Sequence, residues 1–326
     1  MERKINRKIR RVGFIWPYLL AAIVMTYLSY LLPRLLPGDF VTAMYASSHV
    51  TLNAEQEAGL RAYYTGEEGF GRYLVNLFSL NWGHSYAFLA PISQLILSAL
   101  PWTLLLVGGA HVISMIMGFI AGVEAAWRRG GSAEKTSVGC MTILEGVPEI
   151  ATGVGLLLVF AMVLGWFPAS GAETPYAQFR AADRLLDVAH HLALPFCTLI
   201  AAYLPGNFLL TRGSMVMLLK EQFVQTARAK GLPPVRIRYA HAARNALLPM
   251  ITRFGLRFAF MVTGTLVVET IYAYPGLGTL LFNAVSMRDL PLIQSIVLIS
   301  SLMVLVINLA LEWIYGRIDP RVSHGR

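Results

Sequence analysis

Six stretches of the chain are long and apolar enough to cross a membrane as helices, and no other feature constrains the fold as strongly. They lie at about 12–32, 102–123, 138–167, 192–215, 247–272 and 292–315. A spanning helix needs about 20 mostly apolar residues, and it satisfies its own backbone groups where no water is present. With 56% hydrophobic and only 14% charged residues, the 326-residue chain has too few charges to cover a soluble surface. The sequence therefore predicts an all-α membrane protein with six transmembrane helices.

The distribution of Lys and Arg predicts the orientation of these helices. Nineteen of the 27 basic residues fall in the two termini and in the loops after the second and fourth stretches, and six fall in the other loops. Basic loops stay in the cytosol, so we expect both termini there, and the net charge of +9 reflects topology rather than nucleic-acid binding. The first stretch is too long for a signal peptide and is expected to remain as an anchor.

The expected organisation follows from these spans. It comprises a cytoplasmic N-terminus (1–11), the first span (12–32), an outer loop with short interfacial helices (33–101), a core with the other five spans (102–322) and a short tail (323–326). Within the outer loop, Pro101 is expected to separate an interfacial helix at 91–100 from the second span.

A basic, alanine-rich segment at 224–249 interrupts the apolar pattern with five Lys or Arg residues and no acid. Its first part predicts a short helix at about 220–232, which Gly231 and the two following prolines end. Small or apolar residues on this helix could contact a partner: Phe223, Ala227, Ala229, Gly231 and Leu232. A cytosolic helix tied to two spans suits mechanical coupling to a soluble protein. The alternative is an ordinary basic loop that holds anionic lipid headgroups.

Four charged residues fall inside the predicted spans, where an unpaired charge is costly. Glu145 and Glu149 are four residues apart in the third span, as are Arg253 and Arg257 in the fifth, so each pair is expected on one helix face. These residues would form bridges between the helices, most readily from Glu149. Alternatively, they would line a path for a charged substrate.

No motif in the sequence predicts catalysis or a resident cofactor. The chain lacks the glycine-rich phosphate loop, the H-E-x-x-H motif and the G-x-S-x-G motif. The adjacent His190 and His191 point in different directions, so we expect no shared metal ion. His111 is expected to be a packing residue or part of a path lining. Cys140 and Cys197 lie in apolar runs, which predicts two small buried side chains rather than a disulfide.

Several segments, in the same order, resemble the permease subunits of dipeptide, oligopeptide and nickel ABC importers. They are VQTARAKGL, RNALLPMIT, VVETIYAYPGLGTLLFNAV, RDLPLIQ and INLALEWIYGRIDPRV, and they are dense over 190–322. RLLPGD after the first span, the long outer loop and LPWTLLL resemble the first, B-type, of the two permeases in such systems. The resemblance implies the type I ABC importer permease fold in a bacterial or archaeal inner membrane. The chain would form half of a path for peptides, a nickel or other metal chelate, or a glycan.

The resemblance also implies partners and site residues. Such a permease works with a second homologous permease, two subunits that bind ATP and Mg²⁺, an extracytoplasmic solute-binding protein and membrane lipid. The segment at 220–232 would be the coupling helix that docks on an ATP-binding subunit. The residues assigned to this docking are Phe223, Gln225, Thr226, Ala227, Ala229, Lys230, Gly231 and Leu232. Glu269 matches a glutamate of the family and would brace an outer gate with the YPGLG turn at 274–278.

The chain departs from the family pattern in the outer loop. Phe40 follows Pro37-Gly38-Asp39, and NWGHS stands at 81–85 where GDLGxS is usual. These departures concern the substrate rather than the architecture. A stand-alone secondary transporter or channel is the alternative function, but it predicts inverted repeats with broken helices, which the sequence does not show. A membrane scaffold would predict no paired charges within the spans.

Overall fold

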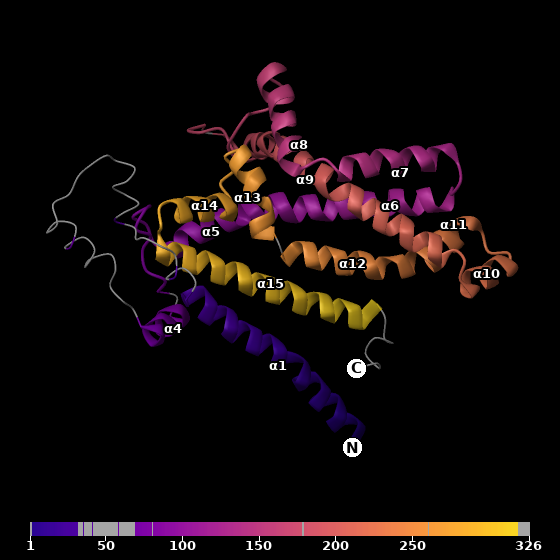
Figure 1. The fold of residues 1–326 in the computed structure, drawn as a ribbon, viewed down its shortest axis with the longest axis horizontal. Coiled ribbons are helices and arrows are strands. Elements are labelled where there is room, and N and C mark those ends of the chain that lie inside the picture. Colours follow the sequence, from indigo (N-terminus) through magenta and orange to yellow (C-terminus); the bar gives the residue numbers. More distant parts are fainter. Residues whose placement is uncertain are drawn as a thin grey trace. The chain divides into compact units, whose positions relative to one another are not determined.

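The computed structural model describes residues 2–31, 35, 41, 58, 69–79, 81–177, 179–259 and 261–318, and these contain helices and no strands. The elements are α1 (Glu2–Leu31), α4 (Phe70–Phe78), α5 (Ile92–Thr103), η2 (Leu104–Gly108), α6 (Gly109–Trp127), α7 (Ser132–Glu145), α8 (Glu149–Leu156), η3 (Leu157–Val163), α9 (Ala181–Leu218), α10 (Gln222–Ala229), α11 (Pro234–Arg236), η4 (Ile237–Ala243), α12 (Arg244–Ala259), α13 (Met261–Ile271), α14 (Leu277–Ser286) and α15 (Leu290–Ile318) (Figure 1). Segments labelled η are π-helical. The prediction of an all-α chain is confirmed.

Three helical segments of the described chain are long and apolar enough to cross a membrane: Ile92–Trp127, Ala181–Leu218 and Leu290–Glu312. A fourth results if the bent pair Ser132–Glu145 and Glu149–Val163 counts as one span. The first predicted span contains a shorter apolar helix, Trp16–Leu31, and the fifth is shared between α12 and α13. The total of six spans stays a prediction.

Pro101 does not break the helix as the sequence predicted. It lies inside α5, and η2 and α6 continue the same helical segment to Trp127. A membrane helix tolerates proline because a local π-helical turn can accommodate the backbone groups that proline frees. Here the π-helical η2 begins three residues after Pro101. The expected interfacial helix at 91–100 is therefore the first part of a long apolar helix.

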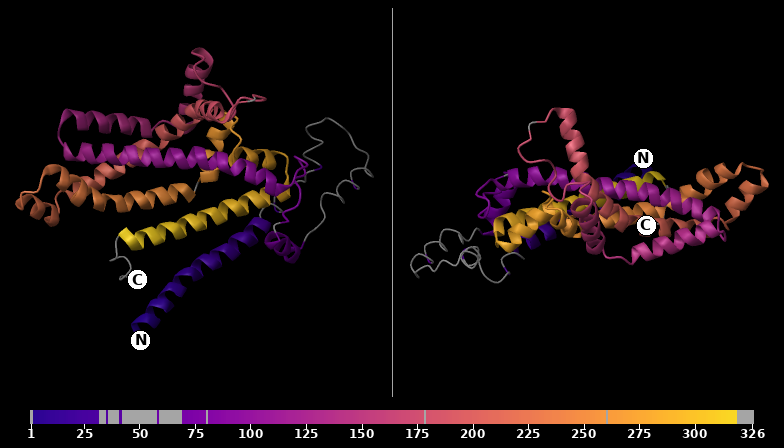
Figure 2. Two further views of the ribbon diagram at one scale, coloured as in Figure 1. Left: turned by 180° about the vertical axis from the view of Figure 1, so that it is seen from behind. Right: turned by 90° about the horizontal axis from the view of Figure 1, so that it is seen from above.

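The chain divides into two compact units, residues 1–101 with 276–309 and residues 102–275 with 310–326. In the second unit α9 contacts α6, α7, α8 and α12, so it is the central helix of this unit (Figure 2). Gly118 and Gly122 of α6 lie close to the backbone of α9. A Cβ at Gly118 would lie 3.0 Å from the backbone N of Phe208, and one at Gly122 would lie 2.8 Å from its carbonyl O. The two helices can pack this closely only because these positions are glycines.

In the first unit, aromatic side chains and one aspartate fix the packing. Tyr30 of α1 packs against Tyr73 of α4, with ring centroids 5.3 Å apart. The fully buried Asp289 accepts hydrogen bonds from Ser85 Oγ at 2.5 Å and from the backbone N of Ala87 at 3.0 Å. It also accepts one from the backbone N of Leu292 at 3.3 Å. Asp289 therefore caps α15 and holds the 85–87 turn against it.

Much of the apolar helix surface points away from the core. Ile116 and Ile120 of α6 are about half exposed, and Cys140 and Cys197 are both exposed. The expectation that the two cysteines are buried is therefore wrong. A membrane helix can turn apolar residues towards lipid or another subunit, so an apolar run does not imply burial within its own chain.

Candidate functional site

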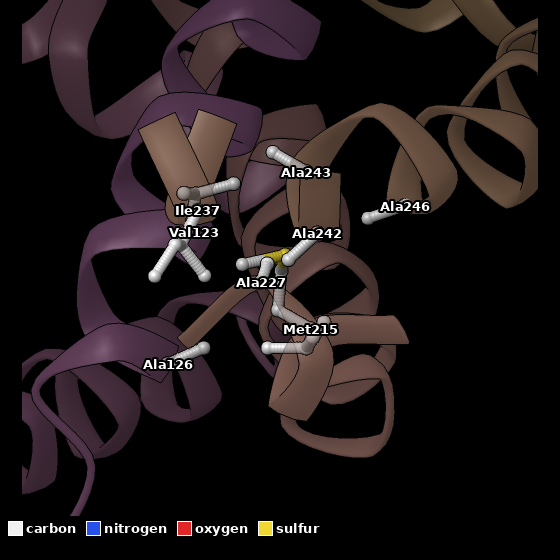
Figure 3. Packing of buried hydrophobic residues seen from close by; sticks show 9 residues of the cluster. Val123, Ala126, Met215, Ala227, Ile237, Ala242, Ala243 and Ala246 are labelled. Atoms are coloured by element: carbon white, nitrogen blue, oxygen red, sulfur yellow. The ribbon is translucent and has the colours of Figure 1, made fainter. Parts of the chain in front are cut away.

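The inward face of α10 packs into the core of the second unit. Val224 is fully buried, and Ala227 is 4% exposed. They belong to a cluster that we call the α10 anchor: Val123, Ala126, Met215, Val224, Ala227, Ile237, Ala242, Ala243 and Ala246 (Figure 3). These residues come from α6, α9, α10, η4 and α12. Five of the nine are alanines, and such small side chains let the surrounding helices approach closely.

The end of α10 agrees with the sequence prediction. Gly231 adopts a positive φ of 70° and donates its backbone N–H to Arg228 O at 2.9 Å. Leu232 donates its backbone N–H to Ala227 O at 3.3 Å, and its side chain packs on the anchor. This is the Schellman arrangement, in which a residue with left-handed φ lets the chain close back over the last turn. It fixes α10 at its carboxyl end.

The residues assigned to coupling divide between two faces of α10. Exposed residues are Phe223, Gln225, Thr226, Ala229, Lys230 and Gly231, whereas Leu232 is half-buried and Ala227 is buried. Ala227 and Val224 are three residues apart, so helical periodicity places both on the packed face. The interpretation of Ala227 as a contact for a partner therefore does not fit this structure, in which its side chain is inaccessible.

The Glu124 carboxylate near the end of α6 binds two side chains of η4 beside the anchor. Arg238 forms an ion pair with Glu124, and Tyr239 donates a hydrogen bond to Glu124 Oε1 at 2.6 Å. This bond to the carboxylate raises the pKa of Tyr239. The Arg238 guanidinium also lies 5.0 Å from the ring centroid of Trp127, and that of Arg228 of α10 lies 5.8 Å from the same ring. Such cation–π contacts add to the ion pair.

A second carboxylate joins α7 to α9. Arg212 Nε donates to Glu134 Oε1 at 2.9 Å, and the backbone N of Gly130 donates to Glu134 Oε2 at 3.3 Å. Glu124 and Glu134 were not among the site residues predicted from the sequence. They could have been identified because they are the only acids between 102 and 144 and stand next to a strongly basic loop region.

Glu145 and Glu149 do not share a helix face. α7 ends at Glu145, α8 begins at Glu149, and the helical segments on either side meet at 94°. Pro148 precedes α8 and disfavours a helical conformation of the residue before it, so the backbone bends here. The expectation of one continuous face is therefore wrong. Arg253 and Arg257 do lie on one helix, α12.

One ion pair joins two of the four residues that we call the membrane charge group: Glu145, Glu149, Arg253 and Arg257. Arg253 Nη2 lies 3.7 Å from Glu145 Oε1. Gly206 of α9 leaves space for this pair, since a Cβ there would lie 2.9 Å from Glu145 Oε1 and would collide with the Arg253 guanidinium. The expected bridge between the helices is present, but Glu145 forms it rather than Glu149.

The other two members of the membrane charge group, Glu149 and Arg257, form no ion pair within 4.0 Å in the described chain. Glu149 Oε1 is buried without a hydrogen-bond partner. Arg257 is exposed, and its guanidinium lies 5.6 Å from the ring centroid of Tyr203.

A small cavity lies beside Arg257, between α6, α9 and α12. It is lined by His111, Tyr203, Asn207, Phe254 and Arg257. The His111 ring is 4% exposed and lies 4.2 Å from the Tyr203 ring, centroid to centroid. Asn207 Nδ2 donates to Ser114 Oγ at 3.3 Å. His111 thus packs among aromatic rings, as expected, and also lines the cavity.

Glu269 and the two adjacent histidines have separate local partners. Thr103 donates to Glu269 Oε1 at 2.7 Å, and both residues are fully buried. His190 Nε2 contacts Trp166 O at 2.8 Å, whereas His191 Nδ1 contacts Asp187 O at 3.0 Å. Within the described residues no cluster of His, Cys, Asp and Glu could hold a metal ion.

Comparison with known proteins relates this helical arrangement to membrane transport. The profile of the family described as "Binding-protein-dependent transport system inner membrane component" matches residues 114–324. The oligopeptide transport system permease protein AppB of Bacillus subtilis is 33% identical over 97% of this chain and 98% of that protein. The chain belongs to this family.

Other members of the family are equally similar along their whole length. The di/tripeptide permease DppB of Pseudomonas aeruginosa is 34% identical over 97% of this chain and 98% of that protein. The glutathione permease GsiC of Salmonella paratyphi A is 32% identical over 98% of this chain and 99% of that protein. This chain is therefore a transport permease subunit of the inner-membrane component family.

A solved structure shows the same fold. The MetNI methionine ABC transporter in an inward-facing conformation contains a chain that aligns with a TM-score of 0.54 at 15% identity. The alignment covers 70% of this chain and 98% of that chain. The fold prediction, an ABC importer permease, is thus confirmed.

Proposed function

We propose that this chain is a permease subunit of an ATP-binding-cassette importer and forms half of a translocation path for peptides or a related small solute. Family membership and full-length relatives that are named as oligopeptide, di/tripeptide and glutathione permeases support this proposal. The partners would be a second permease, two subunits that bind ATP and Mg²⁺, and an extracytoplasmic solute-binding protein.

The observation that carries the coupling role is the exposed face of α10. Phe223 is 39% exposed beside exposed polar residues, while the opposite face of the same helix is locked into the anchor. A short helix that is packed rigidly on its inner face can transmit a movement of a docked ATP-binding subunit to α6, α9 and α12. ATP hydrolysis would take place in the partner subunits, and this chain would supply half of the translocation path.

Reconstitution in proteoliposomes tests the function. With its partners, the chain should import a free dipeptide only when ATP and the solute-binding protein are present. Phe223→Ala should leave the assembly intact but weaken the stimulation of ATP hydrolysis by loaded binding protein. Import by this chain alone, without ATP, would instead establish the stand-alone transporter.

We further propose that the anchor and α10 lie on the cytosolic side, with both chain termini. The excess of basic residues in that region supports this orientation. Single cysteines at Ser132 and Gln225 should react only with reagents added to the cytosolic side, and one at the exposed Tyr176 only from outside. Labelling of Gln225→Cys from outside would reverse the orientation.

A further inference from the structure

The short helix α4 has three faces of different character. Helical periodicity groups residues that are three, four or seven positions apart on one face. Around α4 and its cap the three faces are, in turn, Phe70, Tyr73, Leu74 and Leu77; Gly71, Val75 and Phe78; and Arg72, Asn76 and Ser79. The first two faces are mainly apolar and the third is polar. The apolar part of α4 is therefore wider than a single packed face.

The first face of α4 packs against the end of α1. The Phe70 ring lies 5.4 Å from the Tyr27 ring and 5.2 Å from the Tyr30 ring, centroid to centroid. Tyr73 shares a hydrogen bond of 3.1 Å with Ser29 Oγ. These partners belong to the last turns of the apolar helix Trp16–Leu31 (Figure 1). The contacts thus place α4 at the level where this apolar helix ends.

The second face of α4 is apolar and exposed. Val75 is 67% exposed and Phe78 is 83% exposed. They lie between the face that packs on α1 and the polar face with Arg72, so one side of α4 changes from apolar to polar within a single turn. A helix with this pattern lies at a boundary between an apolar medium and water.

The apolar medium at this place is indicated by α1. Ile23 is 66% exposed, and Tyr27, one turn further along, is 47% exposed and also contacts Phe70. The exposed apolar surface of a membrane helix faces lipid unless another subunit covers it. This surface of α1 continues to α4 without a break at Tyr27. The half-buried Trp82, which donates its Nε1–H to Leu77 O at 3.4 Å, adds a residue type that is enriched where a bilayer meets water.

We propose that α4 lies in the membrane–water interface, with Val75 and Phe78 among the acyl chains of the phospholipids and Arg72 among their headgroups. The partner is the lipid surface itself, and the site fixes the end of α1 at the level of the headgroups. This inference concerns the lipid and not the cargo, so it holds for any transported solute.

Spin labels in the complete transporter, reconstituted in proteoliposomes, test the proposal. Each label is attached to one new cysteine, Val75→Cys or Phe78→Cys, in a background with Cys140→Ala and Cys197→Ala. Oxygen concentrates in acyl chains, whereas a charged nickel chelate stays in water. Labels on the second face should be relaxed more by oxygen than by nickel. Labels on Arg72→Cys and Ser79→Cys, the matched controls on the polar face, should show the opposite order.

A charge on the second face provides a second measurement. Phe78→Asp should pull this face out of the acyl chains, so a label on Val75→Cys should lose its protection from nickel. Ser79→Asp adds the same charge to the polar face and should leave that label protected. Both changes are made at exposed positions, so neither fills a packed site.

Two patterns would overturn the proposal. If nickel relaxes the labels on the second face as strongly as those on the polar face, this face lies in water. If neither reagent reaches them, with or without the loaded solute-binding protein, another protein subunit covers the face instead of lipid. None of these readings depends on transport, so they remain interpretable even if the proposed peptide function fails.

Discussion

The α10 anchor and the membrane charge group belong to the same compact unit, yet the carboxylates in and beside them form ion pairs to different extents. Around the anchor, Glu124 is paired with Arg238 and Tyr239, and Glu134 is paired with Arg212. In the membrane charge group, only Glu145 and Arg253 are paired. Both carboxylates beside the anchor thus have an ion pair, whereas Glu149 in the membrane charge group has none within 4.0 Å in the described chain.

Under the proposed coupling role, the anchor is a mechanical part of the molecule. A segment that transmits force must not deform, so its apolar side chains should be tightly packed by their own chain. Mutations that damage the anchor should therefore lower the stability of the fold.

The largest expected effect comes from filling the anchor. Ala227→Phe places a large ring at a position that is 4% exposed, and overpacking of this kind costs about 1–3 kcal/mol or more. We expect a clear loss of melting temperature in detergent and a low yield of assembled transporter. Ala229→Phe is the control on the exposed face of the same helix and should leave the melting temperature nearly unchanged. Equal losses for the two variants would contradict the packed-face assignment.

The next effect concerns the brace between α6 and η4. Arg238→Gln leaves the Glu124 carboxylate with Tyr239 and Arg128, and it removes the nearer of the two guanidinium groups over Trp127. We expect a destabilisation of about 1–2 kcal/mol, in the range of a hydrogen bond to a charged group. Arg236→Gln changes an exposed arginine two residues away and serves as the control. Thermal unfolding of both variants measures the difference, and identical curves would mean that the brace does not stabilise the fold.

Local signals in the sequence predicted the helical architecture and the end of α10. Gly231 and the prolines after it act within a few residues, so their effect can be read without the rest of the fold. The bend before Pro148 also has a local cause, but the long apolar run around it led to the prediction of one continuous helix. Here the Gly-x-Pro sequence between two charged residues bends the helix despite the apolar run. Proline alone does not decide the outcome, because Pro101 lies within a continuous helix.

Contacts between distant residues were not predictable in the same way. Arg238 and Glu124 are 114 residues apart, and nothing in either local sequence selects the other as a partner. The burial of Ala227 depends on Met215 and Ala242, which lie on other helices. Periodicity identifies which residues share a face of α10, but only the tertiary structure decides which face is packed.

A smaller effect is expected at the glycine beneath the paired charges. Gly206→Ala puts a Cβ where the Arg253 guanidinium lies, so the ion pair with Glu145 must shift. We expect a loss of about 1 kcal/mol, because the end of an arginine can partly move aside. Gly213→Ala on the same helix has no atom within 4 Å of the new Cβ and should be neutral or slightly stabilising. In an Arg253→Ala background the Gly206→Ala loss should shrink, and an undiminished loss would place the clash elsewhere.

The smallest effect tests the comparison within the membrane charge group itself. A double-mutant cycle on Glu145 and Arg253 should give a coupling of about 0.5–1 kcal/mol, since the pair is close but partly exposed. The same cycle on Glu149 and Arg257 should give less than about 0.5 kcal/mol, because the two groups form no ion pair within 4.0 Å in the described chain. Glu149→Gln alone should not lower the melting temperature, because it breaks no ion pair or hydrogen bond of the described chain. If instead the second cycle gave the stronger coupling, Glu149 and Arg257 would be each other's partner, and the contrast between a completed and an open charge site would disappear.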